Sequence, residues 1–203
     1  MTIDNENLLE SILASLERIK YIEVEDIPNI DLYMDQVTGF MDGRLKSTAR
    51  HSSEDRILTK TMINNYAKND LIPPPIKKKY SKEHIILLIF IYYYKGILSI
   101  GDIQRLLSPI TEKYFDTDED FNLESIYREA VKLEKAQLDG LKEDVIRKFQ
   151  EAGETFEEAP KEGKEFLQKF AFICMLSYDV YVKKLMIEKM IDELNKKDAN
   201  KKE

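Results

Sequence analysis

The side chains best suited to chemistry lie between residues 60 and 79, and the chemistry they suit is contact with DNA. An asparagine amide can pair with adenine through two hydrogen bonds, a threonine methyl can touch a thymine methyl, and lysines neutralise phosphates. The residues predicted to read bases are Thr61, Asn64 and Asn65. Those predicted to hold the DNA backbone are Lys60, Tyr66, Lys68, Lys77, Lys78 and Lys79.

The distribution of charge supports this reading more than the total does. The 203-residue chain has a formal net charge of −7, with 31 basic and 38 acidic residues. Residues 44–82 hold ten basic and three acidic side chains, a local charge of +7, so the remainder carries −14. A basic segment inside an acidic chain indicates a polyanion site. A solvated basic face without a partner is the open alternative.

Other chemistries have little support in the sequence. One cysteine and two histidines exclude a disulfide framework and a zinc site with several cysteines. No nucleophile-elbow, zinc-protease or phosphate-loop motif is present. The acidic run 116–120 begins like a calcium loop, but Phe121 and Tyr127 occupy the positions that need glycine and glutamate. We therefore expect no enzyme activity, no metal and no cofactor.

Apolar spacing predicts a mainly α fold that positions the candidate residues. A helix is expected over 8–19, and another from Asn29 or Asp31 to Asp42, stopped by Gly43. The helix carrying the asparagines is expected to begin at its cap Thr59 and to end near Asn69. Prolines 73–75 cannot continue a helix, and they lead into a short basic ribbon at 76–80.

Further helices are expected beyond the ribbon. Ser81 and Ser99 are predicted caps for two of them, and Pro109 is expected to end the second. A helix opened by Asp120 or Asn122 reaches about residue 138, Gly140 and Gly153 mark breaks, and a last helix covers about 163–194.

Two of these predicted helices contain runs that are apolar all round. The run 85–94 predicts a buried central helix. The run 170–178 must be covered on all sides, either as the core of a C-terminal bundle or as a dimer seam, and Cys174 within it is expected to be buried and inert. No apolar run reaches the length of a membrane span and no signal peptide is found, so we expect a cytoplasmic protein.

Four segments resemble the winged helix-turn-helix of the MerR family of bacterial regulators. They are residues 58–74, the pair Tyr80-Ser81, residues 89–91 and residues 96–107. Asn64 stands where that family has arginine in its recognition helix, and Lys78 stands where its wing has arginine. The wider span 27–107 is similar to a family of uncharacterised bacterial proteins, a domain of unknown function, some described as transcriptional regulators.

The resemblance implies a MerR-like winged helix-turn-helix with a short β wing, followed by an all-helical C-terminal domain. The expected domains are 1–26, an N-terminal helix; 27–110, the DNA-binding domain; and 111–203, a helical domain for dimerisation or an effector. We expect a homodimeric regulator specific for double-stranded DNA, with helix 59–69 in the major groove and wing 75–80 on the phosphates. An unidentified small-molecule effector and a helical protein-interaction adaptor that does not bind DNA are the alternatives.

Overall fold

The chain is mainly helical, which confirms the predicted class. A computed structural model describes residues 5–17, 21–46 and 57–199. They form two compact units. One comprises Met1–Arg18 with Glu134–Lys189, and the other comprises Ile19–Leu133 with Met190–Glu203. The functional division expected at residue 110 stays a prediction.

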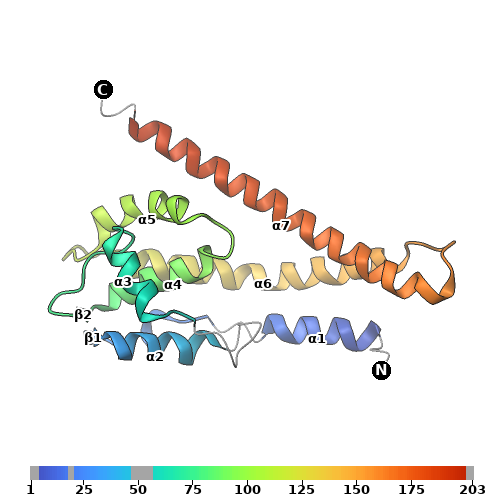
Figure 1. Ribbon diagram of the computed structural model, residues 1–203, viewed down its shortest axis with the longest axis horizontal. Helices are drawn as coiled ribbons and strands as arrows, with labels where there is room; N and C mark the ends of the chain where they lie inside the picture. The colour runs from blue at the N-terminus through green and yellow to red at the C-terminus, as the bar shows by residue number, and fades with distance from the viewer. Residues whose placement is uncertain (1–4, 18–20, 47–56, 200–203) are drawn as a thin grey trace. The chain divides into compact units, whose positions relative to one another are not determined.

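The candidate residues all belong to the second unit, in which a very short antiparallel sheet lies at one end, beside the starts of α2 and α4 (Figure 1). Its elements are the 3₁₀ helix η1 (Val24–Asp26), β1 (Leu32–Tyr33), α2 (Met34–Leu45), α3 (Lys60–Lys68), β2 (Lys79–Tyr80), α4 (Lys82–Tyr94), α5 (Ile100–Tyr114), the first part of α6 (Leu123–Gly153) and the last part of α7 (Lys161–Ala199).

Helix α4 is the centre of this unit, as its apolar run predicts. Every residue from His84 to Ile91 is buried, so the helix is covered all round. Phe90 meets the ring of Tyr127 from α6 edge to face, with centroids 5.4 Å apart. The Tyr127 hydroxyl donates a hydrogen bond of 2.7 Å to the Ile22 carbonyl, which leaves this buried polar group satisfied.

Strand β1 was not predicted. It pairs antiparallel with β2, Leu32 opposite Tyr80 and Tyr33 opposite Lys79. The residues expected to open a helix are therefore extended, and α2 begins only at Met34. Its pairing partner is distant in the chain, so local spacing gives no sign of this strand.

Three expected helix ends are wrong. Gly43 lies inside α2 and Gly140 inside α6, and neither has a positive φ that would end a helix. Pro109 lies inside α5 and does not end it. A mid-helix proline costs about 3 kcal/mol through one lost backbone bond and a ring clash. Helical bonding nevertheless resumes beyond it, where the Phe115 amide donates to the Thr111 carbonyl at 3.2 Å.

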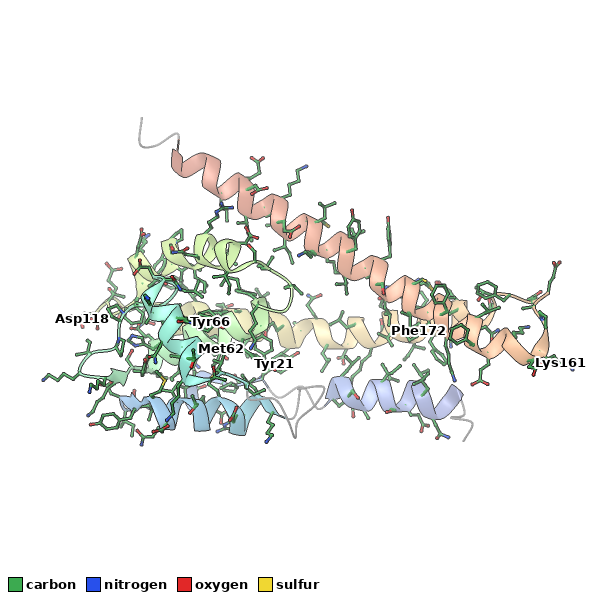
Figure 2. The ribbon with its side chains drawn as sticks, viewed as in Figure 1. Tyr21, Met62, Tyr66, Asp118, Lys161 and Phe172 are labelled. Carbon is green, nitrogen blue, oxygen red and sulfur yellow. The ribbon has the colours of Figure 1, made fainter. Side chains whose placement is uncertain are left out.

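The first unit contains α1 (Asn5–Glu17), the later part of α6 and most of α7 (Lys161–Ala199). Phe172 of α7, labelled in Figure 2, meets Phe149 of α6 edge to face at 5.3 Å. The ammonium of Lys148 lies between the carboxylates of Asp144 and Asp179 and joins the same two helices. Hydrogen bonds to both carboxylates raise the pKa of Lys148.

Within its own unit the run 170–178 is covered on one side only, so it is not the fully buried core of a C-terminal bundle, and the dimer seam stays a prediction. Of its large apolar residues Phe172 is buried, whereas Phe170, Ile173 and Tyr178 are each more than half exposed. Cys174 is exposed too, which corrects its expected burial. The sequence shows that this helix is apolar, but not which of its sides has a neighbour.

A buried histidine joins α4 to the segment that precedes it. His84 is 2% exposed. The Ser81 amide donates to its Nδ1 at 3.0 Å, so the neutral ring carries its proton on Nε2. Loss of hydration lowers the pKa of His84, against smaller opposing effects that include the carbonyls of Pro73 and Pro74. The folded protein therefore holds this ring neutral.

We expect the folded state to lose stability in mild acid because of His84. The unfolded ring takes up a proton near pH 6.5, whereas the folded ring does so at lower pH. Its contribution is therefore present above pH 6.5 and is lost as the pH falls towards the folded-state pKa. Chemical unfolding of the wild type and His84→Asn at pH 7.5 and pH 5 measures this. The wild type should lose more stability between the two pH values than the variant, and equal losses would contradict the assignment.

Candidate nucleic-acid interface

Helix α3 presents two different sides. Ile63 and Tyr66 are buried, 0% and 8% exposed, and they hold the helix to its unit. The opposite side is exposed and spans an arc of about 140° at 3.6 residues per turn. It carries five of the predicted site residues, Lys60, Thr61, Asn64, Asn65 and Lys68.

Tyr66 does not share that exposed side. Figure 2 labels it beside Met62 on α3. Burial raises the pKa of the Tyr66 hydroxyl. We therefore leave this residue, which was expected to contact the DNA backbone, out of the candidate interface.

The start of α3 is held at three points. The Thr59 hydroxyl accepts a bond of 3.2 Å from the Met62 amide, as expected for an N-cap. The Asp42 carboxylate of α2 accepts from the Ile57 amide at 3.0 Å, and the Lys95 ammonium donates to the Ile57 carbonyl at 2.9 Å. The last two contacts join the residues just before α3 to α2 and to the C-cap of α4, and no sequence motif signals them.

The end of α3 is closed by a Schellman motif. The Leu71 amide donates to the Tyr66 carbonyl at 2.8 Å and the Asp70 amide to the Ala67 carbonyl at 3.4 Å. The left-handed residue is Asp70, with φ 55°, which follows Asn69, the residue near which the helix was expected to end. From α5, Gln104 donates to the Asn69 carbonyl at 3.1 Å. Both ends of α3 are thus fixed by contacts with other helices.

The prolines that follow α3 lead into a tight basic turn, which we define as residues 76–79. Ile76 and Lys79 exchange two backbone hydrogen bonds of 3.1 and 2.9 Å. Lys77 and Lys78 between them have φ of 49° and 66°. Two positive φ angles in a two-residue connection are typical of a type I′ turn, which usually carries Asn-Gly. Non-glycine residues in this conformation are strained by about 1 kcal/mol or more each.

The first two lysines of the basic turn are exposed to solvent, and the third is partly buried. Lys77 and Lys78 are exposed. Lys79 is partly buried in β2, and its ammonium lies 5.3 Å from the ring centroid of Tyr33 in β1. The pairing of β1 with β2 therefore anchors the turn to α2, which follows β1 directly.

One lysine of the candidate interface already has an acidic neighbour. Lys60 of α3 forms an ion pair with Asp35 of α2, and both side chains are more than half exposed. Exposed pairs of this kind contribute little to stability. A phosphate could replace Asp35 as the partner of Lys60.

The polar composition of segment 44–56 predicts a loop, either disordered or an arm that contacts phosphate through Arg44, Lys46 and Arg50. Arg44 lies instead in α2 and pairs with Asp26 at 3.3 Å. Lys46 caps the end of that helix. The segment 47–56, with Arg50, lies outside the described residues.

The described residues offer little for a metal site, a ligand cavity or a membrane span. In the described ranges, no group of three or more His, Cys, Asp or Glu residues is arranged to hold a metal ion. A shallow cavity of about 360 Å³ lies beside the end of α3, with Pro74 and Glu112 in its lining. None of the helices in the described part of the chain is both long and apolar enough to cross a membrane.

The middle of the chain matches a known protein family. Residues 22–130, more than half of the 203, match the family model of DUF1836, a domain of unknown function. The match includes every element of the candidate interface, from β1 to β2. Comparisons with curated proteins and with solved structures found no match to the chain. The chain therefore belongs to the DUF1836 family.

Proposed function

We propose that the protein is a transcriptional regulator that binds double-stranded DNA in a sequence-specific manner. In this proposal α3 enters the major groove, and the basic turn contacts phosphates beside it as the wing of a MerR-like winged helix-turn-helix. The observation that carries the proposal is the exposed side of α3, on which amide, hydroxyl and ammonium groups gather opposite a buried apolar side.

The residue types on this side suit groove reading. Thr61, Asn64 and Asn65 are assigned to base edges because their short side chains offer both hydrogen-bond donors and acceptors or a methyl contact. Lys60 and Lys68, at the two ends of α3, are assigned to the phosphates on either side of the groove. Lys77 and Lys78 are assigned to phosphates further along the DNA backbone. Lys79 adds to the positive charge of the basic turn.

Backbone strain adds independent support for a role of the basic turn. Asn-Gly would form a type I′ turn with less strain than Lys-Lys. Strained residues cluster at functional sites, where the side chain matters more than the local conformational energy. Two exposed lysines in left-handed conformation therefore suggest a binding role for their charge.

Selection of genomic fragments by the purified protein, followed by footprinting, tests the proposal. We expect a defined site, with affinity that falls steeply as salt rises because phosphate contacts release counterions. Absence of DNA binding at low salt, together with a stable protein partner in a pull-down, would favour the adaptor alternative instead.

Asn64→Ala should change which sequence is preferred. Loss of a bidentate amide contact removes about 1–3 kcal/mol of discrimination at one base pair. Competition binding with a set of single-base variants of the selected site measures this. The matched control is Lys68→Ala on the same face, which should weaken all sequences about equally. A uniform loss with Asn64→Ala would contradict base reading by this residue.

A further inference from the structure

Helix α7 has an apolar side that nothing in its own unit covers. The large side chains on this side are between 51% and 71% exposed. We call them the outer face of α7, and they are Phe166, Phe170, Ile173, Tyr178, Val180 and Tyr181. Because a helix turns about 100° per residue, they lie within an arc of about 160°. Several large apolar side chains exposed together on one side of a helix are typical of an interaction site.

The packing of α7 against α6 uses the other side of the helix. Phe172 contacts Phe149, Asp179 pairs with Lys148, and Gln168 donates to the Gly153 carbonyl. Phe170 and Phe172 are two residues apart and so point about 200° away from one another around the axis. The contact with α6 therefore leaves the outer face open.

We propose that the outer face of α7 is the seam between two copies of this chain. Phe166, Ile173 and Val180 recur every seven residues, the spacing that lets one helix pack along another in a left-handed supercoil. The proposal concerns the α7 helix outside residues 22–130 and does not rest on DNA binding.

The exposed area is sufficient for a dimer. Aromatic side chains present about 150–250 Å² each, so the four on this face expose on the order of 500 Å² per copy. Two copies would remove about 1,000 Å² from water before the aliphatic residues are counted, which reaches the range of specific interfaces.

The charges around the face favour the chain's own copy as the partner. Glu165 pairs with Lys169 at 2.6 Å near the start of the face, and Lys184 pairs with Glu188 at 3.1 Å beyond its end. Residues 170–178 carry no charge. A rim neutralised within each copy does not repel an identical rim, and it offers little for a strongly charged partner to recognise.

Cys174 makes the arrangement measurable because it is the only cysteine in the chain. It is exposed and lies near the middle of the outer face. A two-fold seam along this face, parallel in register or antiparallel, brings the two Cys174 side chains close together. Treatment of the full-length protein with a short bis-maleimide should give a covalent dimer, and Cys174→Ser should give none.

The second measurement is the molar mass in solution by light scattering. The wild type should have twice the 23.8 kDa chain mass at micromolar concentration. Phe170→Glu combined with Val180→Glu should weaken association at least tenfold and give a monomer with unchanged helical content. Met186→Glu, at an exposed position on the opposite side of α7, should leave the dimer intact.

Some outcomes would overturn the seam. A monomeric wild type, or a dimer that survives the double substitution, excludes it. The seam and the proposed function can fail separately, because Lys77→Glu with Lys78→Glu should weaken DNA binding and leave the dimer unchanged.

Discussion

Substitution of both Lys77 and Lys78 by glutamate is expected to lower affinity for the selected DNA about a hundredfold or more at low salt. Each lysine lost from a phosphate contact removes about 0.9 from the slope of log affinity against log salt, so the slope should fall by roughly two units. The introduced carboxylates add repulsion from the phosphates. Both positions are exposed, so the fold should survive. Titration of labelled duplex at several salt concentrations measures both quantities.

The matched control makes the same change of charge at two other exposed lysines. Lys132→Glu with Lys161→Glu alters two exposed lysines on α6 and α7, neither of which is a residue of the basic turn. It should reduce affinity only slightly, through the change in net charge. If both double variants lose the same affinity, DNA responds to overall charge and the turn has no special role.

Lys77→Asn combined with Lys78→Gly is expected to change stability and binding in opposite directions. Asn-Gly fits two positive φ angles, so the folded state should gain about 1 kcal/mol as strain is relieved. The gain is limited because glycine also makes the unfolded chain more flexible. Removal of two positive charges should weaken DNA binding about tenfold or more. Denaturant unfolding and duplex titration measure the two effects.

The control for this pair is Lys77→Ala with Lys78→Ala. It removes the same charges but keeps a β-carbon at both left-handed positions, so affinity should fall to a similar extent without a gain in stability. Equal stability for the Asn-Gly and Ala-Ala variants would show that the lysines carry little strain. Unchanged DNA affinity in both variants would remove the turn from the interface.

Features that depend on neighbours a few residues apart were predictable. Thr59 caps α3 and Ser99 caps α5 through the amide three residues on, so a short sequence contains both partners. The run 85–94 is apolar on every side, and its residues up to Ile91 are buried as predicted. The exposed polar side of α3 was predicted too, whereas the burial of Tyr66 corrects its expected contact with the DNA backbone.

Features that depend on distant partners were not predictable. Leu32 and Tyr33 form a strand only because Tyr80 and Lys79 lie beside them. The turn that joins Ile76 to Lys79 is local, but it was not predictable either, because Lys77 and Lys78 are not residue types that favour the positive φ they adopt.

The apolar character of α7 follows from its sequence. Phe172 is buried and Phe170 is exposed only because α6 packs along one side of the helix. Hydrophobic spacing and capping are local, so they are encoded in consecutive residues. Strand pairing and the choice of buried side arise from contacts between segments far apart in the chain, and these exist only in the folded molecule.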